Sequence, residues 1–184
     1  RNMGLALNNL GLAYAALGQR DQAVTYYKQA LAIARQQGDS VNEGRIFGNL
    51  GLAYAASGDT EQAIVVYEQA LDIARALGDQ RSVGAALGNL GSAYLTLNDH
   101  HRAIAYHEQA LAISRLISDQ RGECHDLGNL GNAYAALGES HKAIKFYQQA
   151  LAISRTVGDQ RAENYILSTL GMVSARLGEF LRAI

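Results

Sequence analysis

The sequence predicts an all-α protein that is built as a solenoid of antiparallel helix pairs. Proline is absent from the 184 residues, of which 48% are hydrophobic and 18% are charged. A proline-free chain that is rich in Ala and Leu favours uninterrupted helices and leaves little sequence for edge strands. The same residues also recur with a period of forty, without insertion or deletion. Because such a period is the signature of a repeat protein, each repeat is expected to be one helical hairpin.

Three columns of identical residues define the period. They contain Leu10, Leu50, Leu90, Leu130 and Leu170; Gly11, Gly51, Gly91, Gly131 and Gly171; and Tyr14, Tyr54, Tyr94 and Tyr134. We predict a single array with repeats at about 1–38, 39–78, 79–118 and 119–158 and a partial fifth repeat at 159–184. The second helix of the fifth repeat is expected to begin after Gly178. Since neither end shows a polar capping helix, we expect the chain to be a fragment of a longer array.

The second repeat illustrates how each hairpin is encoded. A first helix is expected over 40–57, where Phe47, Leu50, Gly51 and Tyr54 stand at i, i+3, i+4 and i+7. A second helix is expected over 60–77. Gly58 and Gly78 suit left-handed C-terminal caps, and the Asp that follows each of them suits the N-cap of the next helix. The column of glycines at Gly51 is predicted to mark close helix packing, up to and including Gly171.

The motif Phe47-x-x-Leu50-Gly51-x-x-Tyr54, followed by Ala63-x-x-x-Tyr67, resembles the tetratricopeptide repeat. All four full units carry related residues, but the usual period of 34 residues is extended to forty. Arginine also replaces the usual proline near the end of the second helix, where we expect it to complement the helix dipole. These changes are similar to the long-helix subclass of LGN/Pins-type adaptors and bacterial multidomain regulators. The resemblance implies a right-handed solenoid whose first helices line a concave, protein-binding groove.

Four first helices carry an asparagine on the stripe of residues next to the core-facing side. These asparagines are Asn9, Asn49, Asn89 and Asn129. A carboxamide offers both a donor and an acceptor, as the backbone of an extended peptide requires. We therefore predict an Asn ladder that holds peptide backbone in the groove, and the resemblance to the LGN-like family nominates Asn49, Asn89, Asn129 and Arg45 as partner contacts. The alternative is that these residues bond neighbouring helices or are copies inherited by duplication.

Other side chains are predicted to line the groove beside the ladder: Arg45, His125, Leu12, Leu52, Asn132, Tyr165 and Arg176. The flanking position that varies between repeats is predicted to select the partner; it is occupied by Leu5, Arg45, Ala85, His125 and Tyr165. The basic members favour acidic groups, whereas the apolar members favour an amphipathic segment. The predicted partner is therefore an acidic-amphipathic protein or peptide. The rival prediction is a structural or self-associating arm of a larger multidomain protein without a free peptide ligand, and exposed end faces suit end-to-end association.

Composition excludes several other classes of protein. Sixteen Lys and Arg against 17 Asp and Glu give a net charge of −1, without the basic excess typical of nucleic-acid binders. No apolar run approaches the roughly 20 residues of a spanning helix, and no secretion signal is present. A single cysteine cannot form an internal disulfide, which favours a cytoplasmic location. Cofactor-binding motifs are absent, so no cofactor is expected.

Catalysis has little support in the sequence. Cys124 and His125 are neighbours, but adjacent residues of a helix point about 100° apart, which disfavours a nucleophile and base pair. Histidine is concentrated at His100, His101, His107 and His141, and we expect all four to be solvent-exposed turn residues. They lack the partners of a structural zinc site. We therefore predict no catalytic residues and no metal ligands.

Overall fold

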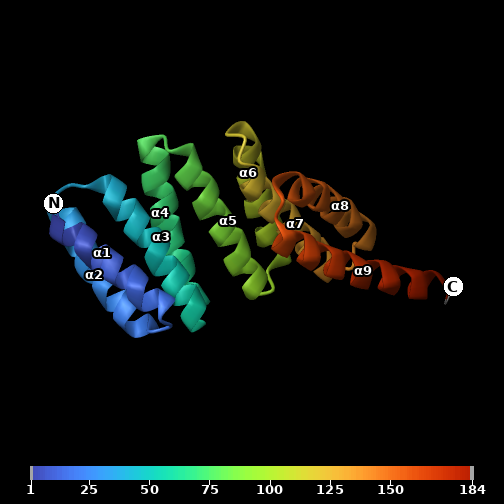
Figure 1. Ribbon diagram of the computed structural model, residues 1–184, viewed down its shortest axis with the longest axis horizontal. Coiled ribbons are helices and arrows are strands. Elements are labelled where there is room, and N and C mark those ends of the chain that lie inside the picture. Colours follow the sequence, from blue (N-terminus) through green and yellow to red (C-terminus); the bar gives the residue numbers. More distant parts are fainter. Residues whose placement is uncertain (1, 183–184) are drawn as a thin grey trace. The chain divides into compact units, whose positions relative to one another are not determined.

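The structure, a computed structural model, describes residues 2–182 and the side chains of 3–178. That range contains nine α-helices and no strand (Figure 1). The helices are α1 (Asn2–Ala16), α2 (Arg20–Gln36), α3 (Ser40–Ser57), α4 (Thr60–Leu77), α5 (Gln80–Thr96), α6 (His100–Leu116), α7 (Gln120–Ala136), α8 (Ser140–Val157) and α9 (Gln160–Arg182). The predicted all-α fold is confirmed, and α3 and α4 have the bounds expected for the second repeat.

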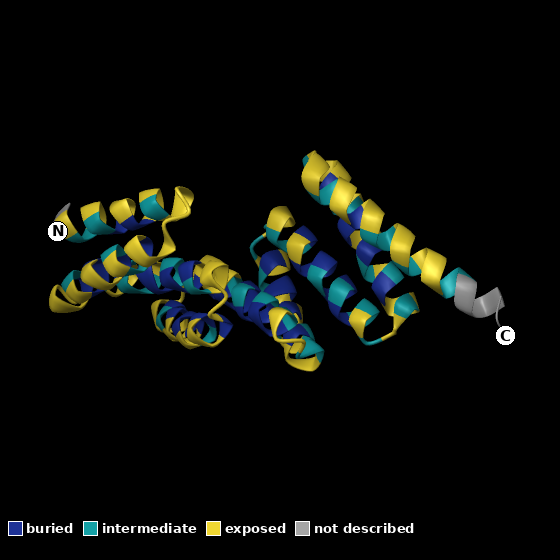
Figure 2. Ribbon diagram, turned by 90° about the horizontal axis from the view of Figure 1, so that it is seen from below, coloured by how far each residue is buried: buried dark blue, intermediate teal, exposed yellow. Residues whose placement is uncertain are grey.

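Two compact units make up the chain. Unit 1 comprises residues 1–93 and unit 2 comprises residues 94–184, so that α5 contributes to both. In unit 1, α1 packs on α2 and α3, and α3 packs on α4. In unit 2, α7 packs on α6 and α8, and α9 packs on α8. Most helices bury one side and expose the other, as Figure 2 shows. The repeat boundaries within a single longer array stay a prediction.

The turns between helices confirm the predicted caps. Glycine with positive φ ends the turn at Gly18, Gly38, Gly58, Gly78, Gly138 and Gly158. Aspartate then accepts a backbone N–H of the next helix in most turns; Asp59, for example, accepts from the N–H of Gln62 at 3.2 Å. In the third repeat, Asn98 and Ser118 hold the left-handed position instead, with φ of 58° and 56°. The chain therefore turns at the same places even where glycine is missing.

The glycine column marks close packing in both units, as predicted. A Cβ atom on Gly51 would lie 2.2 Å from Cε1 of the Tyr67 ring, and one on Gly131 would lie 2.5 Å from Cε1 of Tyr147. Real Cβ atoms do not come this close to a ring, so these positions need glycine. Gly171 is an exception, because nothing lies within 4 Å of its Cβ position.

The expected turn at Gly178 is not present. Helix α9 passes through Gly178 and continues to Arg182. The prediction of a second helix beginning after Gly178 is therefore wrong for the described residues, and its last two positions, 183 and 184, lie outside them.

The arginines near the ends of the second helices do more than complement the helix dipole. Nε of Arg35 lies 2.8 Å from Oε1 of Glu43, at the start of the next helix. The same contact recurs at 2.7 Å between Arg115 and Glu123, and again at 2.7 Å between Arg155 and Glu163. These ion pairs connect α2 with α3, α6 with α7 and α8 with α9, whereas Arg75 of α4 has Val83 at the equivalent acidic position. Pairs of this kind contribute little stability, about 0–1 kcal/mol each.

Candidate peptide-binding surface

In each unit, the predicted ladder positions lie on the first helices, and we name the side of these helices that carries them the first-helix surface of that unit. It carries Asn9 of α1, Asn49 of α3 and Asn89 of α5 in unit 1, and Asn129 of α7 and Thr169 of α9 in unit 2. In unit 1, Asn9 is exposed, whereas Asn49 and Asn89 are partly buried. Nδ2 of Asn49 donates to Oδ1 of Asn8 at 2.9 Å. Asn49 therefore bonds the neighbouring repeat, which is the alternative that the sequence left open for these residues.

Unit 2 surrounds Asn129 with other polar side chains. Nδ2 of Asn129 lies 3.2 Å from Nε2 of His125, and Nδ2 of Asn132 donates to Oδ1 of Asn129 at 3.3 Å. Asn132 also contacts the hydroxyl of Tyr165 at 3.0 Å and accepts from the hydroxyl of Tyr147 at 2.8 Å. Four sequence-predicted site residues, His125, Asn129, Asn132 and Tyr165, are thus brought together on α7 and α9.

The remaining predicted residues are less closely grouped. Arg45 is exposed on α3 and donates to Oδ1 of Asn42. Leu12 and Leu52 are exposed apolar residues of α1 and α3. Arg176 lies toward the other end of α9, where it lines a cavity of about 590 Å³ beside the α7–α8 turn. Arg176 is therefore not brought to the cluster around Asn129.

A recess in unit 1 opens between successive first helices. This α3/α5 recess has a volume of about 520 Å³. Its polar lining includes Arg45, Asp79, Ser82 and Asn89, and its apolar lining includes Val41, Tyr67, Ile73, Leu77 and several alanines. Gly44 and Gly48 of α3 complete the wall. A volume of this size is within the range of about 300–1,000 Å³ that is typical of ligand pockets.

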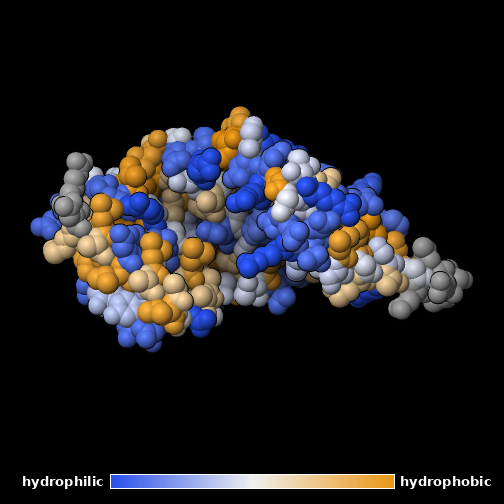
Figure 3. All heavy atoms as spheres, in the orientation of Figure 1, coloured by the Kyte–Doolittle hydropathy of each residue, from blue (hydrophilic) through white to orange (hydrophobic). Residues whose placement is uncertain are grey.

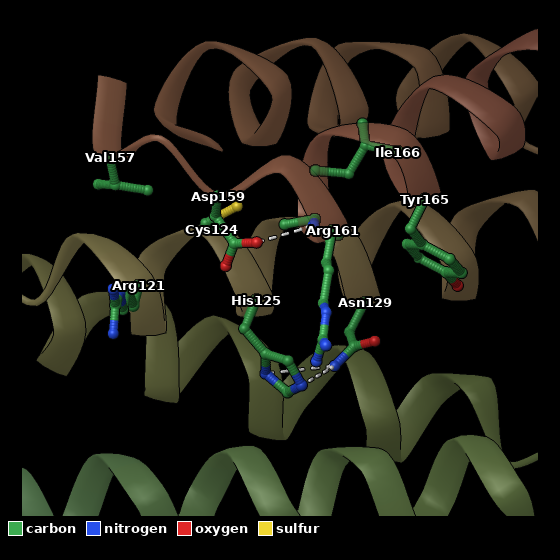
Figure 4. A pocket seen from close by; sticks show the side chains of 11 residues that line it. Arg121, Cys124, His125, Asn129, Val157, Asp159, Arg161, Tyr165 and Ile166 are labelled. Carbon is green, nitrogen blue, oxygen red and sulfur yellow. Dashed lines mark hydrogen bonds between the residues drawn. The ribbon is translucent and has the colours of Figure 1, made fainter. Parts of the chain in front are cut away.

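Unit 2 has an equivalent recess, which is displaced by eighty residues along the sequence. The α7/α9 recess has a volume of about 340 Å³ and is shown in Figure 4. Its apolar lining is formed by Cys124, Val157, Ala162 and Ile166, and its polar lining by Arg121, His125, Asn129, Asp159, Arg161 and Tyr165. In Figure 4, the Arg161 side chain extends in the direction of His125 and Asn129.

A third equivalent position, between α1 and α3, is almost filled. This α1/α3 recess has a volume of only about 10 Å³ and is lined by Leu5, Asn8, Ile33, Asn42 and Ile46, among others. Asn8 is buried there and takes the place of Gly48 and Gly128 in the open recesses. The first-helix surface is therefore not uniform from repeat to repeat.

Exposed apolar side chains accompany the polar groups. Figure 3 shows apolar residues mixed with polar ones on the visible face of unit 1. Leu10 is 44% exposed, although its equivalents Leu50, Leu90 and Leu130 are almost fully buried. Leu17 of the following turn is also exposed. The surface thus offers apolar contact area as well as hydrogen-bonding groups.

Two of the four histidines differ from the sequence-based expectation of exposed turn residues: His100 is only partly exposed, and His107 is buried. His107 lies in the middle of α6, is fully buried, and contacts Oδ1 of Asp126 through Nδ1 at 3.0 Å. Ser114 donates to Oδ2 of the same carboxylate at 3.3 Å. Burial raises the pKa of Asp126, but hydrogen bonds and charge from His107 and His125 outweigh burial, so that the pKa of Asp126 is lowered overall.

The neighbouring residues Cys124 and His125 face different surroundings, as expected for adjacent helical positions. Cys124 is buried and its thiol donates to the carbonyl oxygen of Ala150 at 3.4 Å, whereas His125 is exposed. Burial raises the pKa of the Cys124 thiol, and the negative charges of Asp159 and Glu123 act in the same direction. A thiolate nucleophile is therefore disfavoured here. Among the described side chains, no group of three or more His, Cys, Asp or Glu residues is placed to hold a metal ion.

The sequence interpretation missed two features that a comparison between repeats could have revealed. His107 occupies the position of Tyr27, Tyr67 and Tyr147, and Asp126 occupies that of Ile46 and Ile166. Both are polar exceptions in otherwise apolar columns, in consecutive helices. The second feature is the column of Asn8, Gly48, Gly88, Gly128 and Ser168, whose glycines have no packing partner at Gly48 and Gly128. Sequence alone gave no account of these glycines.

Comparisons with solved structures place the fold among known solenoids. BtubC (BKLC) from P. vanneervenii is 23% identical, with a TM-score of 0.84 over 96% of this chain and 74% of that chain. Aspartyl phosphate phosphatase F from Bacillus subtilis is 17% identical, with a TM-score of 0.89 over 98% and 48%. A STAND signal-transduction ATPase with a tetratricopeptide repeat sensor, from Pyrococcus horikoshii, is 19% identical, with a TM-score of 0.85 over 92% and 26%. At these identities the likeness shows the fold alone.

Family membership comes from the sequence. A comparison with curated proteins found no match. None of the helices in the described range is long and apolar enough to cross a membrane. The family model described as "Tetratricopeptide repeat" matches residues 2–76, 66–116 and 82–156, which together span most of the chain. This chain therefore belongs to the tetratricopeptide repeat family.

Proposed function

We propose that this chain is a non-catalytic module that binds an extended protein segment or peptide on its first-helix surface. The observation that carries the proposal is the position of Asn89 and Asn129, which line the α3/α5 and α7/α9 recesses respectively. Each carboxamide can donate to a peptide carbonyl and accept from a peptide N–H. The adjacent recess can take a side chain. Repeat proteins of this kind commonly use extended concave surfaces for binding.

The chemistry of the surface favours an acidic-amphipathic partner. Arg45 and His125 are exposed beside Asn49 and Asn129, and exposed Leu12 and Leu52 add apolar area. The similarity of the forty-residue repeats to LGN/Pins-type adaptors supports the same kind of partner. We place the protein in the cytoplasm within this proposal, on the ground that its single cysteine can form no internal disulfide.

The test is the replacement of Asn49, Asn89 and Asn129 together by alanine. Peptides are first selected from a random displayed library on the wild-type chain, and the affinity of an enriched peptide is then measured by calorimetry. We expect the triple variant to bind that peptide about tenfold more weakly or worse, because several hydrogen bonds are lost. Helix content by circular dichroism should change little. Equal affinity, or the absence of any enriched peptide, would contradict the proposal.

A matched control separates ligand binding from the contact between Asn49 and Asn8. Replacing Asn8 by alanine removes the acceptor of Asn49 while leaving Asn49, Asn89 and Asn129 in place. This variant should keep its affinity for the selected peptide. If Asn8→Ala weakens binding as much as the triple variant does, the asparagines act by connecting helices, which is the alternative interpretation.

The second candidate function is a self-associating arm, and exposed Leu10 favours it. Leu10 occupies the position of core leucines but is 44% exposed, and Leu17 of the turn after α1 is also exposed. A second copy could cover the exposed core-column position of Leu10, which is not part of the ladder, by end-to-end stacking. Sedimentation analysis of the wild type and of Leu10→Lys/Leu17→Lys should then show association that only the wild type undergoes. A wild-type chain that stays monomeric at high concentration would exclude this function.

A further inference from the structure

The three recesses of the first-helix surface differ most clearly at one helical position. The α1/α3 recess has Asn8 there and is nearly filled, at about 10 Å³. The α7/α9 recess has Gly128 there and is open, at about 340 Å³. A second position, on the first helix that forms the opposite wall, contributes as well. It is occupied by Asn42 in the filled recess and by the equivalent Ala162 in the open one. Small residues facing each other across two first helices therefore open the recess.

The packing of the helices does not require glycine at position 128. A Cβ atom on Gly128 would have no other heavy atom within 4 Å, whereas one on Gly131 would meet the Tyr147 ring. Glycine in a helix interior is destabilising relative to alanine. A destabilising residue with no packing reason, located on the wall of a recess, is typical of a functional position.

The rim of the α7/α9 recess carries positive charge. Arg121, Arg161 and His125 line it, and the carboxylate of Asp159 accepts the backbone N–H of Ala162 at 3.0 Å as a helix cap. The ion pairs found among the described residues use other arginines, such as Arg115 and Arg155, and not Arg121 or Arg161. Two guanidinium groups beside an apolar recess are suited to a carboxylate ligand.

We propose that the α7/α9 recess is an anchor site for one aromatic side chain of a bound segment, with a carboxylate next to that side chain. Val157, Ala162 and Ile166 provide apolar contact for the ring, and the half-exposed ring of Tyr165 stands at the edge, where an aromatic pair can form. Arg161, whose side chain extends toward His125 and Asn129 in Figure 4, receives the carboxylate, and Arg121 adds positive charge at the other end of the recess. Gly128 keeps the site open, and the arginines on its rim distinguish it from the α3/α5 recess, which Gly48 keeps open in the same way. That a protein segment binds to this surface at all rests on the proposed function.

The α3/α5 recess does not offer the same chemistry. It is larger, at about 520 Å³, but Arg45 is the one basic residue in its lining, and Arg45 already donates to Asn42. Asp79 lines this recess, as the equivalent Asp159 lines the α7/α9 recess, so the basic residues are what distinguish the two. A ligand that combines a ring with a carboxylate should therefore prefer unit 2, and Gly48 supplies a matched control for Gly128.

A small probe tests the anchor site without any peptide partner. N-acetyl-L-phenylalanine carries one ring and one carboxylate, and N-acetyl-L-phenylalanine amide lacks the carboxylate. Titrated at millimolar concentration into the full isotope-labelled chain, the acid should saturably shift the backbone amide signals of residues 121–129 and 157–166. The amide should bind several-fold more weakly, because it has no charge for Arg161 to receive.

Two glycine variants decide the role of Gly128. Gly128→Asn should weaken binding of the acid by about tenfold or more, since it recreates the side chain that fills the α1/α3 recess, and Gly48→Asn should leave binding unchanged. Both variants should melt no earlier than the wild type. Absence of saturable shifts in the wild type, or equal binding by Gly128→Asn, would overturn the anchor site.

The same variants distinguish failure of the anchor from failure of the proposed function. If a selected peptide depends on the asparagines but binds Gly128→Asn as well as the wild type, the anchor is wrong and peptide binding stands. If the acid binds at residues 121–129 but no peptide is ever enriched, the recess stands and the proposed function fails.

Discussion

Nδ1 of His107 lies 3.0 Å from Oδ1 of Asp126, and both side chains are buried between α6 and α7. The equivalent positions are occupied by Tyr27 of α2 with Ile46 of α3, and by Tyr147 of α8 with Ile166 of α9. The contact between α6 and α7 thus has a polar pair where these other helix pairs have an aromatic and an aliphatic residue. Because buried polar groups are costly when unpaired, the two residues depend on each other.

Asp126→Ala should be strongly destabilising because it leaves His107 and Ser114 without their shared acceptor. The expected loss is about 3–5 kcal/mol, the range found when one partner of a buried pair is removed. Restoring the apolar pattern with His107→Tyr and Asp126→Ile together should bring stability back to within about 1 kcal/mol of the wild type or above it. Urea unfolding followed by circular dichroism measures both. A double variant as unstable as Asp126→Ala would show that the pair has no mutual dependence.

The lowered pKa of Asp126 predicts a contribution to stability that depends on pH. An unfolded Asp has a pKa of about 3.9, and the folded value is lower because His107 and His125 favour the carboxylate. The folded chain therefore binds fewer protons than the unfolded chain in this range. The contribution is present above about pH 3.9 and is lost as the pH falls through the folded pKa.

The comparison that checks this prediction is wild type against Asp126→Asn. The difference between their urea midpoints should shrink as the pH falls below about 3.9. Other carboxylates titrate in the same range, but they are common to both proteins and cancel in the difference. A difference that stays constant or grows at low pH would contradict a lowered pKa.

The fold was predictable because it is encoded by a repeated pattern. Phe47, Leu50 and Tyr54 have the spacing of one helical face, and Gly58 with Asp59 ends one helix and caps the next. Each of these signals is local, and each recurs in other repeats. The structure therefore agrees with the bounds expected for α3 and α4.

The interior of individual repeats was less predictable. His107 was interpreted through its nearness in sequence to His100 and His101, whereas its place in the repeat puts it at a buried tyrosine position. Recess volumes depend on side chains from three helices at once, so that the effect of Gly128 is not visible in any one segment. The turn expected at Gly178 failed because a turn also needs a following helix that can pack.

Two glycines of α3, separated by less than one turn, should respond oppositely to the same substitution. Gly51→Ala places Cβ 2.2 Å from the Tyr67 ring and should cost about 1–3 kcal/mol through overpacking. Gly48→Ala meets nothing within 4 Å and should stabilise α3 by about 0.5–1 kcal/mol, because alanine is the better helix former. Thermal and urea midpoints of the two single variants check the prediction. Equal effects at both positions would mean that helix propensity, rather than contact with Tyr67, decides the outcome.

Ser118 in the turn before α7 offers a site for stabilisation. Its φ of 56° lies in the left-handed region, where most turns of this chain have glycine. A non-glycine residue is strained there by about 1–2 kcal/mol, and substitution by glycine relieves this strain. Part of the stability gained is offset by the greater freedom of glycine in the unfolded chain. Ser118→Gly should therefore raise the free energy of unfolding by about 0.5–1 kcal/mol. Asn98, with φ of 58°, is the matched control, because asparagine tolerates this conformation better than serine does. Asn98→Gly should change the urea midpoint less than Ser118→Gly, and the reverse order would show that the left-handed strain at Ser118 is relieved by other contacts.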